Sequence, residues 1–128
     1  MVYQVTDGVG IKVETTYREE VSHPHDSEFL FSYQITIENL SAYPIQLLNR
    51  HWEIVDAFGY VNVVDGEGVV GVQPILEPGA SYTYNSAAVI NAEIGRMSGF
   101  YEMINLYNHK SFIVTIPEFQ LVTPYVLN

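Results

Sequence analysis

Three glycines with the spacing G-x-G-x-x-G, namely Gly66, Gly68 and Gly71, form the part of the chain best suited to hold a ligand. Glycine adopts positive φ without strain, and its missing Cβ lets backbone N–H groups converge on an anion, so this spacing could cradle a phosphate. In a dinucleotide-binding fold, a helix begins at the end of such a motif. Here Val72-Gln73-Pro74 follows instead, and proline disfavours a helix interior. The motif therefore predicts a loop between strands, with phosphate binding as one hypothesis and a strand bulge and turn as the other.

Charge around the glycine motif limits what it could bind. Asp65 and Glu67 place negative charge beside a phosphate ligand and would repel it. A nearby Arg50 or Arg96 would offset this repulsion, and a divalent cation would remove it by bridging the phosphate and the carboxylates. The sharpest form of the hypothesis is therefore a pyrophosphate or nucleotide held together with a divalent cation. Its ligand-binding residues would be Gly66, Glu67, Gly68, Gly71 and Arg50.

Arg50 has a further claim to importance because of its place in a predicted strand. By alternation it shares the face of Leu48, Trp52 and Ile54, so its guanidinium should be partly buried. A buried guanidinium requires a carboxylate or carbonyl partner. We favour the interpretation that Arg50 forms an internal ion pair or hydrogen bonds at a strand edge. The alternative is that it contacts a ligand.

Metal binding has weaker support in the sequence. Imidazole suits cobalt, nickel and zinc, and the chain has four histidines: His23, His25, His51 and His109. The first two lie in a polar loop, where solvent exposure is the usual outcome. His51 alternates with Trp52 and should face away from the core. The identity of any metal is left open.

Catalysis would require a nucleophile beside a base, or two carboxylates in a cleft. Suitable residue types are present without a spacing that brings them together: Ser86, His51, Glu53 and Asp56. We therefore expect that the protein is not an enzyme, and a phosphohydrolase is the least favoured alternative.

Composition and charge exclude several classes of protein. The 128 residues suffice for one domain, 1–128, with residues 1–8 as an N-terminal arm. The lack of cysteine excludes disulfides and thiolate metal sites. Fifteen acidic and five basic side chains give a net charge of -10, which disfavours nucleic acid and anionic membranes and favours cations or basic proteins. Without a signal-peptide pattern or a long apolar run, we expect a soluble cytoplasmic protein.

Alternating apolar and polar residues predict a series of short strands. They cover residues 9–17, 29–37, 45–56, 60–64, 81–89, 97–105 and 112–116. Pro78-Gly79 marks a turn, the segment 89–96 is interpreted as a loop, and Pro117 should end the last strand. About seven or eight strands without a convincing helix predict an all-β fold, an antiparallel β-sandwich, with a barrel as the alternative.

Two features favour an immunoglobulin-like or fibronectin type III-like sandwich. Trp52 lies on the third predicted strand, where immunoglobulin-type folds place a core tryptophan. Leu76, Pro78, Gly79 and Tyr82 resemble the Leu-x-Pro-Gly-x-x-Tyr turn of fibronectin type III modules. Both bear on the fold alone, because a fold does not fix a function.

A long ordered set of residues resembles the ApaG domain family. The resemblance rests on residues 38–40, 44–48, 50–54, Asp56, Gly59, 65–71, 73–74, 76–79, Gly95, Met97, Gly99, Tyr101, Met103, 112–117 and 119–121. The chain departs from the family pattern at Ser41, Ala87 and Asn91-Ala92-Glu93. The retained segments cover nearly the whole chain from about Ile11 onwards.

The resemblance implies a fibronectin type III-like sandwich that acts as an interaction module, as in relatives fused to F-box and polymerase-delta-interacting proteins. It also implies a link to cobalt and magnesium homeostasis, although a chain without a membrane segment cannot itself be the pore. We therefore expect a non-catalytic cytoplasmic binding module whose partner is a protein. Whether it forms a homo-oligomer is left open.

Overall fold

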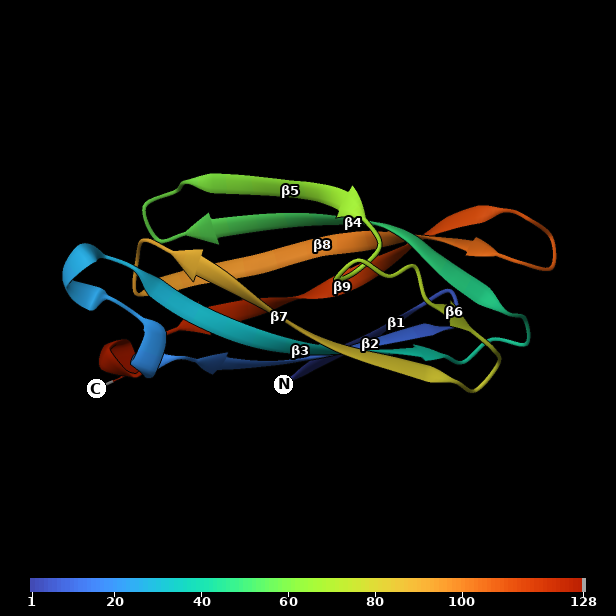
Figure 1. Ribbon diagram of the computed structural model, residues 1–128, viewed down its shortest axis with the longest axis horizontal. Helices are drawn as coiled ribbons and strands as arrows, with labels where there is room; N and C mark the ends of the chain where they lie inside the picture. The colour runs from blue at the N-terminus through green and yellow to red at the C-terminus, as the bar shows by residue number, and fades with distance from the viewer. Residues whose placement is uncertain (128) are drawn as a thin grey trace.

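Two antiparallel β-sheets pack face to face in the computed structural model, which describes residues 1–127 (Figure 1). The strands are β1 (Val2–Thr6), β2 (Val9–Tyr17), β3 (Phe29–Asn39), β4 (Ile45–Asp56), β5 (Val61–Glu67), β6 (Ile75–Leu76), β7 (Ser81–Ile90), β8 (Ile94–Asn105) and β9 (Ser111–Val122). Helical structure in residues 1–127 is limited to three 3₁₀ turns, η1 (Glu19–Val21), η2 (Pro24–Asp26) and η3 (Pro124–Leu127). None of these is long and apolar enough to cross a membrane.

The strand order confirms the predicted sandwich. The first sheet has the order β1-β2-β3-β7, and the second has the order β5-β4-β8-β9, with β6 also paired to β4. In immunoglobulin terms, β2, β3 and β7 correspond to strands A, B and E. Strands β4, β8 and β9 then correspond to C, F and G, with β5 added beside C.

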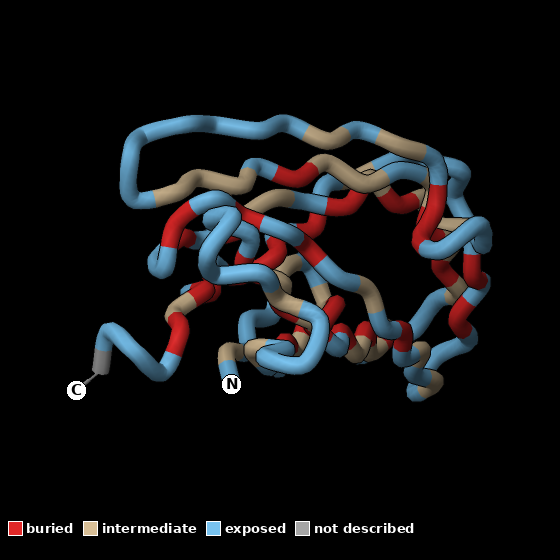
Figure 2. Tube along the Cα trace, turned by 60° about the vertical axis from the view of Figure 1, so that its left-hand side comes forward, coloured by how far each residue is buried: buried red, intermediate tan, exposed pale blue. Residues whose placement is uncertain are grey.

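The core lies between the sheets because each strand alternates apolar residues inward and polar residues outward. Buried and exposed positions follow one another along the chain (Figure 2). On β3 the buried side chains are those of Phe29, Phe31, Tyr33, Ile35 and Ile37. Trp52 is 3% exposed and packs edge-on against Tyr33 and Phe119, with ring centroids 5.7 and 5.9 Å away.

An irregularity in β4 decides which of its residues face the core. The pairing with β8 shifts register between Leu47 and Asn49, so Leu48 is an extra residue in the strand. We expected Leu48 on the face of Trp52, but Leu47 is the fully buried residue and Leu48 is only half-buried. Beyond the bulge, the alternation places Arg50 on the inner side with Trp52.

Other segments also differ from expectation. Residues 1–8, expected to be an N-terminal arm, contain β1, which pairs with β2 along its whole length. The segment 89–96 is mostly strand, since β7 runs to Ile90 and β8 begins at Ile94. Pro117 does not end the last strand, and β9 continues to Val122. It lies where the β8–β9 pairing shifts register, a place where its missing N–H is tolerated.

The two lateral sides of the sandwich differ. On one side, β9 of the second sheet contacts β1 and β2 of the first. On the other side, the sheets end in β5 and β7, and cavities lie along these two strands. The region that surrounds the glycine motif and Arg50 therefore belongs to the open side of the sandwich.

Candidate functional site

The glycine motif forms a tight hairpin turn. The N–H of Val69 donates to the carbonyl of Val72 at 2.8 Å, and the N–H of Val72 donates back to Val69 at 3.0 Å. Val70 and Gly71 lie between them with φ of 48° and 76°. Two consecutive positive φ angles in a two-residue loop are typical of a type I′ turn. The prediction of a loop between strands, with no helix launched at Gly71, is confirmed.

Close backbone contacts explain the second glycine of the motif. Gly68 has a φ of 61°, and a Cβ at this position would lie 2.3 Å from the carbonyl oxygen of Val72. Its own N–H donates to the carbonyl of Leu48 at 2.8 Å. With Val69 and Val72, three amide N–H groups of the hairpin therefore donate to carbonyls within the protein, and these groups are not free to hold a phosphate.

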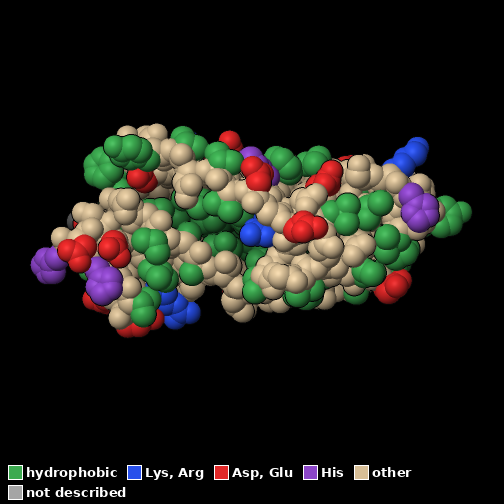
Figure 3. Space-filling model, turned by 45° about the horizontal axis from the view of Figure 1, so that its top comes forward, with side chains coloured by type: hydrophobic (Ala, Val, Ile, Leu, Met, Phe, Trp, Pro, Cys, Tyr) green, Lys and Arg blue, Asp and Glu red, His purple; other side chains and the backbone are tan. Residues whose placement is uncertain are grey.

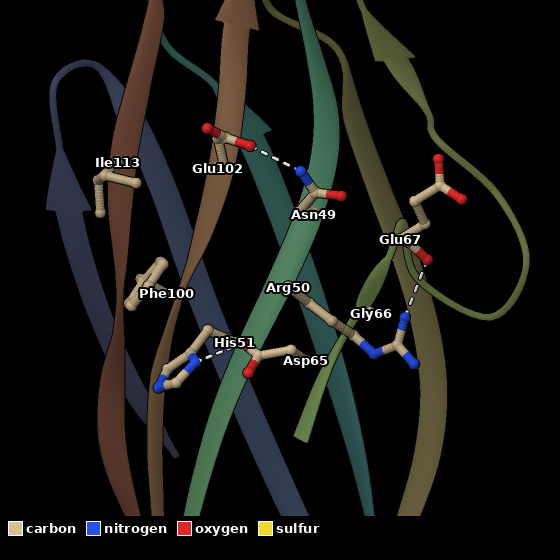
Figure 4. Close-up of a pocket in the computed structure, with 9 residues that line it drawn as sticks. All are labelled: Asn49, Arg50, His51, Asp65, Gly66, Glu67, Phe100, Glu102 and Ile113. Atoms are coloured by element: carbon tan, nitrogen blue, oxygen red, sulfur yellow. Dashed lines mark hydrogen bonds and ion pairs between the residues drawn. The ribbon is translucent and has the colours of Figure 1, made fainter. Parts of the chain in front are cut away.

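The first glycine of the motif provides space for Arg50. Arg50 pairs with Gly66 across β4 and β5, and a Cβ on Gly66 would lie 2.7 Å from the guanidinium. Nη1 of Arg50 donates to the carbonyls of Glu67 and Gly68, each at 2.9 Å. Figure 4 shows the side chain reaching from β4 towards β5. Of the two partners expected for Arg50, a carboxylate or a carbonyl, the structure shows carbonyls.

The rest of the Arg50 guanidinium is unpaired within residues 1–127. No carboxylate in this range lies within ion-pairing distance of it, and Nε and Nη2 have no acceptor there. The positive charge acts on nearby phenols. Burial raises the pKa of Tyr33, while a hydrogen bond with Ser86 and the charge of Arg50 partly counter that rise.

A groove lies on the open side of the sandwich and includes Arg50. One cavity of about 280 Å³ is lined by Arg50 and Trp52 of β4, Asn62 of β5 and Ser86 of β7. A second, of about 480 Å³, shares Asn62 and Val89 with it and continues towards Asp56 and Tyr60. We call the two together the edge groove. In Figure 3, hydrophobic side chains and one basic side chain lie in a hollow along the middle of this face.

A further depression of about 500 Å³ is also lined by Arg50, with Gly66 and Glu67, and extends over the outer face of the second sheet. There Nδ1 of His51 lies 2.5 Å from a carboxylate oxygen of Asp65, and the His51 ring stacks on Phe100 at 4.7 Å. The amide of Asn49 donates to Glu102 at 2.6 Å (Figure 4). The expectation that His51 faces away from the core is confirmed.

Of the predicted site residues, the structure brings Arg50, Gly66, Glu67 and Gly68 together. Gly71 lies at the tip of the hairpin, where a Cβ would have no atom within 4 Å apart from those of the adjacent residues. In residues 1–127 no three His, Asp or Glu side chains converge to hold a metal ion, so the histidines do not form a common site. Ser86 lines the edge groove, whereas His51 lies on the outer face of the other sheet.

Sequence reasoning missed the edge groove itself. The sequence feature that could have indicated the groove is β7, whose ten residues, SYTYNSAAVI, include no charged residue, proline or glycine. The alternation along β7 was recognised, but the pattern does not tell an edge strand from a central one.

Comparisons with known proteins agree on one family. A family model described as the ApaG domain matches residues 19–105. "Protein ApaG" of Salmonella arizonae and that of Salmonella newport are each 45% identical to this chain over 120 residues, which covers 94% of this chain and 95% of theirs.

Solved structures agree as well. A crystal structure from Bordetella pertussis described as an ApaA protein is 36% identical, with a TM-score of 0.87 and 95% of each chain covered. A protein from Archaeoglobus fulgidus, 16% identical with a TM-score of 0.51, is similar in fold alone.

Proposed function

This chain belongs to the ApaG domain family, and on that premise we propose that it is a non-catalytic, cytoplasmic binding module whose free β7 edge pairs with an extended segment of a partner protein. The link to cobalt and magnesium homeostasis that the resemblance implies would then run through that partner. The observation that carries the proposal is the unprotected edge of β7 beside the edge groove.

Natural sheets usually protect their edges with charged residues, proline, bulges or covering segments. β5 ends in Asp65-Gly66-Glu67, and β9 contains Pro117 and Glu118. β1 has five residues and lies against β9. β7 has ten residues and none of these devices. Its outer edge is therefore the part of either sheet best suited to accept another strand.

The groove beside β7 suits this mode of binding. When a peptide is added to a sheet edge, main-chain hydrogen bonds supply affinity and alternate side chains enter pockets. Tyr60, which lines the edge groove, is 76% exposed, and Phe58, two residues before it, is 73% exposed. Exposed aromatic residues are favoured contacts at protein interfaces. The net charge of -10 favours a partner that is basic outside the paired segment.

Selection from a library of random ten-residue peptides tests the proposal. We expect the enriched peptides to protect β7 amides from hydrogen exchange. Val89 lines both cavities of the groove, so Val89→Lys places a charge there. This substitution should weaken binding of the enriched peptides by about tenfold, which corresponds to about 1.4 kcal/mol. Ile113→Lys, an exposed aliphatic position on β9, is the matched control and should bind normally. The proposal fails if no peptide is enriched, or if protection maps to another strand.

A pyrophosphate or nucleotide held with a divalent cation at Gly66–Gly71 is the second candidate. The position of Arg50 over Gly66 favours it, since a guanidinium is the basic group that the motif needs. Its support is weaker, because three hairpin amides donate to protein carbonyls and Nη1 of Arg50 is engaged by two more. A phosphohydrolase activity would further require a base beside the bound phosphate.

A further inference from the structure

We infer that the guanidinium of Arg50 is a recognition site for a carboxylate, carried by an acidic side chain of the strand that pairs with β7. This inference rests on the proposed function and adds to it the chemistry of the partner. It follows from three features: the direction of the Arg50 side chain, its unused donors, and the walls of the smaller cavity of the edge groove, which Arg50 lines.

The side chain of Arg50 brings its charge from β4 to the open edge of the second sheet. Because Gly66 has no Cβ, the guanidinium can lie over β5. Figure 4 shows it beside Gly66 and the carbonyl of Glu67. A strand added to β7 would lie opposite β5, so its inward side chains would point towards this guanidinium.

The unused donors have the geometry that a carboxylate requires. Nη1 donates hydrogen bonds to the carbonyls of Glu67 and Gly68, and these two bonds fix the plane of the guanidinium. Nε and Nη2 have no acceptor within residues 1–127. Their two parallel N–H groups match the two oxygens of a carboxylate. The hairpin therefore holds Arg50 in place and leaves one side of it for a ligand.

The walls of the cavity favour a carboxylate over a phosphate. Arg50 is the only Lys or Arg among the lining residues, so a doubly charged phosphate would keep one charge unbalanced. Ser86 and Asn62 offer polar groups, and Trp52, Val64 and Met97 supply apolar surface. An ion pair gains strength in such partly apolar surroundings. A single carboxylate on an otherwise apolar or neutral strand fits these walls best.

The test of the inference uses the peptides that are enriched on the wild-type protein. The affinity of each peptide is compared with that of its counterpart in which Glu is replaced by Gln or Asp by Asn. We expect one acidic position to be shared, and its neutralisation to weaken binding by roughly 10-fold to 100-fold. Arg50→Gln should remove this preference. Ser86→Asp should also remove it, because the new carboxylate would lie in the same cavity and pair with Arg50. Asn85→Asp, which adds the same charge to the adjacent exposed residue, is the matched control and should keep the preference.

Ser86→Asp also protects the test against a folding defect, since Arg50→Gln withdraws the donor from two hairpin carbonyls. Peptides that bind β7 equally well with and without the acidic group would overturn the inference and leave the proposed function intact. Failure to enrich any peptide would instead overturn the proposed function. The small carboxylate 3-phenylpropionate is a further probe. If it binds at Arg50 and the acidic peptides do not, the carboxylate does not come from a partner strand, and the inference is overturned.

Discussion

Arg50 connects the glycine hairpin to the edge groove. Nη1 donates to the carbonyls of Glu67 and Gly68, and the residue also lines the cavity beside β7. Gly66 is needed for this arrangement because the guanidinium occupies the space of its missing side chain. Part of the glycine motif therefore serves to position an arginine.

Gly66→Ala should destabilise the protein through this contact. A Cβ would lie 2.7 Å from the guanidinium, which must then shift and lose its hydrogen bonds to the two carbonyls. Because the guanidinium is the end of a flexible side chain that can shift, we expect a modest loss of about 0.5–1.5 kcal/mol in the free energy of unfolding, measured with urea. In an Arg50→Ala background the same glycine substitution should cost much less, and equal costs in both backgrounds would contradict the contact.

A buried pair of phenols lies near Arg50, which pairs with Tyr101 across β4 and β8. The hydroxyls of Tyr84 and Tyr101 are 2.5 Å apart, and Tyr101 is fully buried. Burial is the main cause that raises the pKa of Tyr84 above 10. The pKa of Tyr101 is also raised, first by burial and second by the neighbouring Tyr84. Each hydroxyl is thus the polar partner that lets the other be buried.

Tyr84→Phe should leave the Tyr101 hydroxyl without its partner and cost about 1–3 kcal/mol. Adding Tyr101→Phe should cost less than the sum of the single changes, because both polar groups are then gone. Urea unfolding of the two single variants and the double variant measures this coupling. If the loss in the double variant equals the sum of the losses in the two single variants, the two hydroxyls do not depend on each other.

The same pair predicts a dependence on alkaline pH. Since the folded-state pKa lies above the unfolded value of 10, the contribution to stability is complete below pH 10 and is lost as the pH rises towards the folded value. The free energy of unfolding should therefore fall above pH 10, and less steeply in the double phenylalanine variant. Tyr107→Phe, at a 72% exposed position, should keep the wild-type slope.

At the scale of elements, the hairpin at residues 69–72 contains a residue poorly suited to its conformation. Val70 adopts a φ of 48°, and a β-branched residue rarely takes this left-handed conformation. The bulge at Leu48 acts at the same scale, since it turns Arg50 inward and His51 outward. Local irregularities of the backbone therefore decide the surroundings of the candidate site.

Val70→Asn should stabilise the protein, because Asn-Gly is a preferred sequence for a type I′ turn. We expect a gain of about 0.5–1 kcal/mol in the free energy of unfolding. Val63→Asn, an exposed position within β5, is the control and should bring no gain. A loss of stability in Val70→Asn would show that Val70 has a role besides forming the turn.

At the scale of the whole molecule, charge and packing set what can approach. The net charge of -10 repels phosphates at long range, and the hairpin amides of Gly68, Val69 and Val72 are engaged. The side closed by β1, β2 and β9 leaves the β5–β7 side as the accessible one. These features favour binding of a protein segment over binding of a nucleotide.

A thermal shift experiment separates these two ligands. We expect no shift with pyrophosphate, ATP or diadenosine polyphosphate, each with and without magnesium or cobalt. A ligand at 100 times its Kd would stabilise the fold by about 2.7 kcal/mol, a shift of several degrees for a chain of this size. A peptide enriched on β7 serves as the positive control. A shift that requires the divalent cation would favour the nucleotide at Gly66–Gly71 instead.

Local patterns were sufficient to predict most of the fold. Alternation correctly located β2 and β4, and the turn at Pro78-Gly79 is present, with the N–H of Ala80 donating to Glu77. The loop at the glycine motif and the need of Arg50 for a carboxylate or carbonyl partner were also predicted correctly. These properties depend on the φ preferences and polarity of residues that are neighbours along the chain.

The bulge at Leu48, the passage of β9 through Pro117 and the pairing of β1 required the tertiary structure. So did the edge groove and the place of Arg50 in its lining. Alternation along a strand is the same whether the strand has one neighbour or two. Whether an edge stays open depends on how two sheets pack, and that packing joins residues far apart in the chain.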